Sequence, residues 1–267
     1  MTSPEPSPPE RTEAPLWAPF AALAITIVAV SSLEGAALGL AHENDPNHLP
    51  LAAGLAFTVV QDLVLILAAW LALRLSLGRA GPAELGLRKV TRAGRAAAAV
   101  IAVYLIFLFT AYVLARIFGN PPDQELVKDI KAEKSTAVLA GFAVMTCVVA
   151  PVAEELFFRG FMFRVFAARI GPIWGALLCG VVFGLVHAPN PVVGLVALGV
   201  LGVGLCALYW RFQSIIPCMA LHALNNSITF GLTVKLEDAA FLGLVAASVG
   251  LVVAGASAVS ARPAVAA

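Results

Sequence analysis

The feature of this sequence that most constrains its fold is a series of long apolar runs separated by short polar breaks. A transmembrane helix needs about 20 mostly apolar residues. Eight stretches of the chain meet this requirement: Leu16–Leu40, Leu51–Leu73, Ala96–Phe118, Ala137–Phe158, Pro172–Ala188, Val192–Trp210, Ile215–Leu232 and Ala239–Ser260. With 60% hydrophobic and 12% charged residues, the chain has more apolar surface than one soluble core can hide. We therefore predict an all-α fold, a polytopic membrane helix bundle with about eight transmembrane helices.

Short polar segments mark both ends of the chain. Residues 1–15 contain five prolines and three glutamates before the first apolar run, a composition typical of disordered segments. We expect residues 1–15 to form a disordered cytoplasmic tail, residues 16–260 to be embedded in the membrane, and residues 261–267 to form a short C-terminal tail. Four glycines of the sixth run predict close packing between helices: Gly194, Gly199, Gly202 and Gly204.

Basic residues predict the orientation, because the cytoplasmic loops of membrane proteins carry an excess of Lys and Arg. If the N-terminal tail is cytoplasmic, the alternation of eight spans puts twelve Lys and Arg on that side and five on the other. The loop from Arg74 to Arg95 contributes six of the twelve. We therefore predict a multi-pass protein of the cell membrane with both termini in the cytoplasm.

Charge and cysteine usage narrow the range of partners. The formal net charge of +1 provides no basic surface for nucleic acid, so the expected partner is membrane lipid. Four cysteines lie in apolar runs without metal-ligand spacing, and we expect them to be buried and unpaired: Cys147, Cys179, Cys206 and Cys218. The sequence carries no signal for a particular oligomeric state.

Ionisable residues inside the apolar runs are the first candidates for function, because a charge within a membrane is costly. Glu34 and Asp62 lie in the first two runs. Such groups usually hide in the interior of a helix bundle, and this reading is as good as a functional one for both. We build no mechanism on them.

Two adjacent glutamates in the fourth run have different expected roles. Glu155 and Arg159 are four residues apart on a helix, in the orientation that favours an ion pair. The side chain of Glu154 then points about 100° away around the helix axis, toward a neighbouring element. The alternative is that both glutamates are ion-paired residues at a helix end.

A turn at Gly171-Pro172 brings a histidine to the depth of these glutamates. Glu154 and His187 are each about 16 residues from this turn. In an antiparallel helix pair, equal separations from the turn place two residues at similar depth, about 25 Å from it. A carboxylate and an imidazole are therefore predicted to meet, although a lone histidine near a helix end is commonly a hydrogen-bonded core residue.

The seventh run supplies a third polar group. His222 and Asn226 are four residues apart and share one helix face, while their neighbours are apolar. Facing lipid would be costly for both, so we expect them to point inward. Their alternative role is a hydrogen-bonded contact between helices.

Together these residues resemble the motifs of a known family. Glu154-Glu155 with Arg159, Phe183 with His187, and His222 with Asn226 match Glu-Glu-x-x-x-Arg, Phe-x-x-x-His and His-x-x-x-Asn in order. On three predicted membrane helices, this order resembles the CAAX protease and bacteriocin-processing family of intramembrane proteases, also called CPBP or Abi. The resemblance implies a catalytic core at about residues 137–232.

The resemblance implies two alternative mechanisms of peptide hydrolysis. Without metal, Glu154 and His187 take a proton from water while His222 and Asn226 donate hydrogen bonds to the oxyanion, and Glu155 holds Arg159. With Zn²⁺, the ligands are Glu154, His187 and His222, and the metal activates the water. We prefer the metal-free mechanism by a small margin.

The implied activity is that of an endopeptidase. Its substrate would be a membrane-associated peptide or protein, such as a CAAX-type C-terminus, a bacteriocin leader or a C-terminal sorting segment. The alternative is a catalytically inactive membrane scaffold or a transport-associated protein, in which the polar groups serve helix association or a solute pathway.

Overall fold

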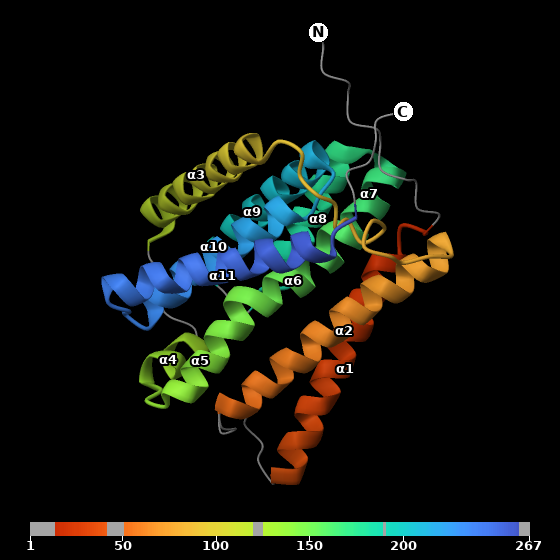
Figure 1. Ribbon diagram of the computed structural model, residues 1–267. Coiled ribbons are helices and arrows are strands. Elements are labelled where there is room, and N and C mark those ends of the chain that lie inside the picture. The colour runs from red at the N-terminus through yellow and green to blue at the C-terminus, as the bar shows by residue number, and fades with distance from the viewer. Residues whose placement is uncertain (1–13, 42–50, 120–124, 189–190, 262–267) are drawn as a thin grey trace.

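The protein is a bundle of helices, described by a computed structural model for residues 14–41, 51–119, 125–188 and 191–261 (Figure 1). The elements, in chain order, are α1 (Ala18–Ala41), α2 (Leu51–Leu77), α3 (Ala93–Phe118), α4 (Glu125–Ala132), α5 (Thr136–Val144), η2 (Met145–Val149), α6 (Ala150–Glu155), η3 (Leu156–Met162), α7 (Phe163–Ile170), α8 (Pro172–Leu185), α9 (Val192–Phe212), α10 (Ile216–Thr233) and α11 (Asp238–Val259). The predicted fold class, a polytopic all-α bundle, is confirmed. Of the tails predicted at residues 1–15 and 261–267, residues 1–13 and 262–267 lie outside the described residues.

All eight predicted apolar runs are helical, but they differ in their capacity to cross a membrane. Six helical segments of the described chain are long and apolar enough to span, among them a continuous run from Thr136 to Ile170. The helix α8 has 14 residues, which is shorter than the apolar core of a bilayer requires. The helix α10 has 18 residues but carries His222, Asn225 and Asn226. The chain is a multi-pass membrane protein, and the prediction of eight spans counted two helices that fall short of these criteria.

The central run from Thr136 to Ile170 is one helix of 35 residues, about 50 Å long at 1.5 Å per residue. Two of its segments, η2 and η3, have π-helical hydrogen bonding. Pro151 lies in the first turn of α6, directly after η2, and has no N–H to offer to the carbonyls of the preceding turn. The helix α6 therefore lies between two π-helical segments. π-turns within α-helices are frequently found at functional sites.

Close helix packing surrounds this central run. In Figure 1, α8 and α9 lie beside each other, and α1 and α2 form a separate pair on the opposite side of the green helices α5 and α6. The contact of α8 with α9 depends on glycine: a Cβ on Gly202 would lie 2.9 Å from the Cα of Gly180, and one on Gly180 would lie 2.7 Å from the carbonyl oxygen of Gly199. The predicted packing role of the glycines at 199 and 202 is confirmed.

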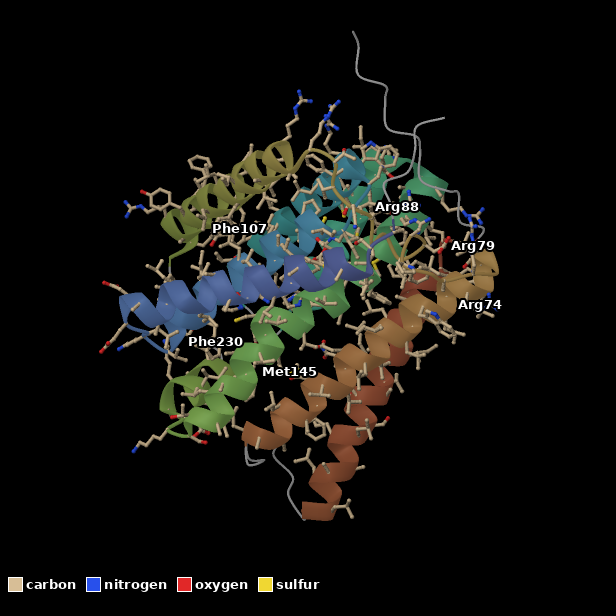
Figure 2. All side chains as sticks on the ribbon, viewed as in Figure 1. Arg74, Arg79, Arg88, Phe107, Met145 and Phe230 are labelled. Carbon is tan, nitrogen blue, oxygen red and sulfur yellow. The ribbon has the colours of Figure 1, made fainter. Side chains whose placement is uncertain are left out.

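One end of the bundle gathers the basic loop and both ends of the described chain. Arg169 donates to the carbonyl oxygen of Ala14, and Ala261 exchanges backbone hydrogen bonds with Leu87 and Lys89. Figure 2 shows Arg74, Arg79 and Arg88 at this end, with Met145 and Phe230 toward the other. Ala14 and Ala261, the two ends of the described chain, therefore lie at the same end of the bundle, and the placement of both termini in the cytoplasm stays a prediction.

Candidate active site

The two adjacent glutamates lie at the end of α6, where the helix faces α2 on one side and α10 on the other. Glu155 is fully buried, and the side chain of Glu154 is 14% exposed. The helix α10 presents His222 to this point, and the histidine is also buried. Glu154 and Glu155 precede His222 by 68 and 67 positions in the chain. The structure therefore brings residues of two separate motifs into one site.

Glu155 is the centre of a buried hydrogen-bond network. Its Oε1 accepts from Arg159 Nη1 at 2.8 Å and from His222 Nδ1 at 2.8 Å. Because a carboxylate oxygen only accepts, Nδ1 of the imidazole carries a proton. This bond fixes the orientation of the ring and turns Nε2 toward Glu154, much as second carboxylates orient histidines in other enzymes. The predicted Glu155–Arg159 ion pair is present, and Glu155 has an additional role that the sequence did not indicate.

Arg159 is fully buried, and two of its guanidinium nitrogens find acceptors, whereas Nε has none among the described residues. Besides the bond to Glu155, Nη2 donates to the carbonyl oxygen of Gly202 at 3.1 Å. The guanidinium carbon lies 4.5 Å from the centre of the Phe183 ring, within the range of a cation–π interaction. Arg159 thus connects the π-segment η3 to both α8 and α9.

Glu154 is the carboxylate that takes no part in this hydrogen-bond network. Its Oε2 is buried and has no hydrogen-bond partner among the described residues. It lies 3.9 Å from Nε2 of His222, a separation too long for a direct hydrogen bond and suited to a bridging water. The alternative in which both glutamates are ion-paired therefore applies to Glu155 alone.

His187 lies just past the end of α8, and Phe183 links it to the site. Its Nδ1 is 2.7 Å from the carbonyl oxygen of Phe183, so this nitrogen is the donor. The Phe183 ring lies 4.9 Å from the His187 ring and 5.7 Å from the His222 ring, measured between centroids. The predicted meeting of His187 with Glu154 stays a prediction, since the described geometry sets His222 against Glu154.

Asn226 lies one turn beyond His222 and contacts the central helix. Its Nδ2 donates to the carbonyl oxygen of Thr146 at 2.9 Å, and its Oδ1 accepts from Asn225 at 3.2 Å. The carbonyl of Thr146 lies in the turn where Pro151 withholds an N–H, so Asn226 supplies a donor that the helix lacks. The amide retains a second N–H for another acceptor.

Asp62 is the residue of this site that sequence reasoning set aside. It is 1% exposed on α2 and lies within electrostatic range of Glu154 and His222. The sequence signal was an ionisable residue in a predicted span, and Glu34 carried the same signal. Only the packing of α2 against α6 distinguishes them.

The candidate zinc ligands are only partly assembled. Glu154 and His222 are neighbours, but in the described part of the chain no three His, Cys, Asp or Glu side chains are gathered closely enough to hold a metal ion. The zinc ligand set of Glu154, His187 and His222 stays a prediction. We derive no catalytic step through a metal. As predicted, the four cysteines are buried and free.

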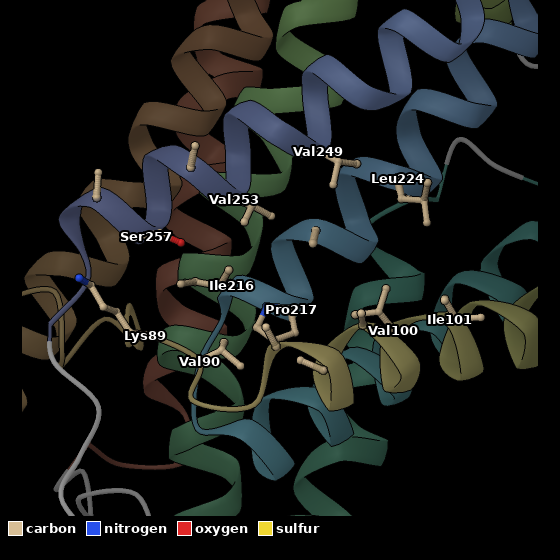
Figure 3. A pocket seen from close by; sticks show the side chains of 16 residues that line it. Lys89, Val90, Val100, Ile101, Ile216, Pro217, Leu224, Val249, Val253 and Ser257 are labelled. Carbon is tan, nitrogen blue, oxygen red and sulfur yellow. The ribbon is translucent and has the colours of Figure 1, made fainter.

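A separate apolar pocket lies behind α10, between α3 and α11 (Figure 3), and has a volume of about 740 Å³. The helix contributes Pro217, Ala220 and Leu224 to this pocket. These residues are on the face opposite to His222 and Asn226, given 100° per residue. The helix α10 therefore has a polar face toward α6 and an apolar face toward the pocket.

The fold and this site define a class: a multi-pass helical membrane protein with carboxylates and an imidazole buried inside its bundle. Residues 136–228 match the family model of the Rce1-like type II CAAX prenyl endopeptidases. The predicted family resemblance is thereby confirmed for this part of the chain, which is similar to an Rce1-like domain. It contains every catalytic residue predicted from the sequence.

A curated relative of this chain adds no function. The chain is 32% identical over 133 residues to the uncharacterized protein YyaK of Bacillus subtilis strain 168. The aligned segment covers 45% of this chain and 44% of that protein, less than half of each. No solved structure matches the chain.

Proposed function

We propose that this protein is an intramembrane endopeptidase that cleaves a membrane-associated peptide or protein, with a prenylated CAAX-type C-terminus as the favoured substrate class. The observation that carries the proposal is the buried pair of Glu154 and His222, an unpartnered carboxylate 3.9 Å from an oriented imidazole inside an Rce1-like domain. Bacteriocin leaders and C-terminal sorting segments are the other substrate classes for the test.

In the proposed mechanism, a water molecule binds between Oε2 of Glu154 and Nε2 of His222. Glu154 removes a proton from this water as its oxygen attacks the carbonyl carbon of the scissile peptide bond. The C–N bond then breaks, and the proton passes from Glu154 to the leaving nitrogen, so the products are a carboxylic acid and an amine. His222 lies on the other side of this water, and Glu155 fixes the orientation of its ring.

The oxyanion requires hydrogen-bond donors. Asn226 has one N–H beyond the one it gives to Thr146, and we propose it as a donor to the oxyanion. His187 is the second proposed contributor, from the end of α8 above the Phe183 ring. These roles differ from those expected from the sequence, because His222 is placed beside the attacking water and does not donate to the oxyanion.

The test is hydrolysis by purified full-length protein in lipid nanodiscs. Prenylated CAAX-type, leader and sorting peptides are supplied as substrates. Glu154→Gln keeps the shape and removes the base, so kcat should fall by about 10² or more, with folding intact. His222→Ala and His187→Ala should lower kcat by a similar factor. Combining either one with Glu154→Gln should lower kcat little further than Glu154→Gln alone.

Asn226→Ala affects both catalysis and structure, because it removes the proposed oxyanion donor and also orphans the Thr146 carbonyl. We expect a milder loss of activity than for Glu154→Gln, with a stability loss of about 1–3 kcal/mol for the orphaned group. Activity measured before and after chelation and Zn²⁺ readdition tests the zinc mechanism. A Glu154→Gln protein that processes its substrate at the normal rate would overturn the proposal and favour a scaffold.

A further inference from the structure

A buried carboxylate outside the Rce1-like domain adjoins the proposed active site. Asp62 lies on α2, far before residues 136–228 of the matched segment. The buried residues of α2 are Asp62, Leu65, Ala69 and Leu73, which follow the helical spacing of a single inward-facing stripe. Asp62 is thus the polar member of the seam with which α2 packs against α6 and η3.

The surroundings of Asp62 do not satisfy it. Among the described residues, neither Oδ1 nor Oδ2 has a hydrogen-bond partner, and Oε2 of Glu154 has none either. Asp62 is 1% exposed, so bulk water does not solvate it. Buried polar groups in proteins are almost always hydrogen-bonded to protein or to ordered water.

The site holds more acceptors than donors. The two carboxylates only accept when ionised. Nδ1 of His222 donates to Glu155, so this donor is not available to them. Asp62 lies within electrostatic range of both Glu154 and His222. A water molecule offers two O–H donors, so one water can satisfy an oxygen of Asp62 together with Oε2 of Glu154.

We propose that Asp62 is a further catalytic residue of this protein: with Glu154 it accepts the two O–H groups of the attacking water beside His222, so that α2 completes the active site of the Rce1-like domain. Glu154 takes one proton of this water, and Asp62 accepts a hydrogen bond from the other. The water is thereby fixed with a lone pair directed at the substrate carbonyl. This inference rests on the proposed function and adds a residue that the matched domain does not contain.

The experiment compares Asp62→Asn and Asp62→Ser with Glu34→Gln, assayed for hydrolysis in nanodiscs beside wild type and Glu154→Gln. Glu34 is a matched control because it is an acidic residue of the neighbouring helix α1 and is partly exposed. Misplacing a reacting group costs about 10²-fold, so we expect a loss of that order in kcat for both Asp62 variants, with KM unchanged. Glu34→Gln should retain wild-type activity.

Two further readouts exclude a structural role. Removing an unsatisfied buried carboxylate should leave the thermal midpoint of Asp62→Asn unchanged or raised, and combining it with Glu154→Gln should add little to the loss in kcat. A lower thermal midpoint with normal kcat, or a rise in KM alone, would overturn the proposal. If Glu154→Gln is inactive while Asp62→Asn is normal, only the role of Asp62 fails; if Glu154→Gln is itself active, the proposed function fails.

Discussion

Replacing Arg159 with methionine tests how much of the fold depends on the buried ion pair. The substitution keeps a long side chain of similar reach but removes the cation. Glu155 would then keep only its bond to His222, and the carbonyl of Gly202 would lose its donor. The charge of Glu155 would have no compensating partner in a fully buried position.

These lost interactions determine how much unfolding free energy the substitution removes. Removing one partner of a buried ion pair costs about 3–5 kcal/mol, and the cation–π contact with Phe183 adds about 0.5–2 kcal/mol. Folded domains are stable by only about 5–15 kcal/mol. We therefore expect Arg159→Met to lose about 4–7 kcal/mol of unfolding free energy, together with most of the expression level and the activity.

The assay is reversible unfolding in mixed micelles, followed by tryptophan fluorescence and by protein level in the membrane fraction. A second change separates stability from catalysis. Glu155→Gln combined with Arg159→Met leaves no unpaired charge and retains an acceptor for His222, so most of the lost stability should return. Glu155→Met with Arg159→Met should be similarly stable but inactive, because nothing then orients His222.

The control is Arg211→Met, since the Arg211 side chain is exposed at the end of α9. Exposed substitutions usually change stability by less than about 0.5 kcal/mol. The reasoning is refuted if Arg159→Met unfolds at the same denaturant concentration as wild type, or if its loss is no greater than that of Arg211→Met.

Two further predictions concern packing and topology. Gly202→Ala should lose about 1–3 kcal/mol by overpacking, because its Cβ would lie 2.9 Å from Gly180 Cα; Gly250→Ala, with open space at its position, should be neutral or slightly stabilising in the same unfolding assay. Tags at Met1 and Ala267 and single cysteines in the loop from Arg74 to Arg95 should react with impermeant reagents from the cytoplasmic side only, and labelling from the outside would invert the orientation.

The apolar runs predicted the fold well because each transmembrane helix must satisfy its backbone internally and can be recognised by length and composition. The same reasoning counted as spans two helices, α8 and α10, that fall short in length or in hydropathy. A short helix such as α8 continues the apolar pattern into the turn that contains His187, and hydropathy does not show where the helix ends. The two π-helical segments were also not predicted, because a turn that holds one extra residue has no characteristic amino-acid composition.

The site was predictable where it depended on local spacing. The i,i+4 relation of Glu155 to Arg159 was sufficient to predict their ion pair. The bond from His222 to Glu155, by contrast, depends on how α10 crosses α6, which no local pattern encodes. Asp62 and Glu34 were equivalent in the sequence, and only tertiary packing makes one of them a neighbour of Glu154.

Because the π-helical segments η2 and η3 lie on either side of α6, the site is sensitive to where in the central helix a residue is added or lost. A single deletion within η3 would allow a regular α-helix of one residue fewer to form, with no loss of hydrophobicity. Because a π-turn holds one residue more than an α-turn, closing it takes up the deletion locally, and the segments on either side keep their relative orientation. The same deletion in the regular α-helix α7 would rotate the two sides by about 100° relative to each other, so a deletion should be tolerated better within η3 than in α7.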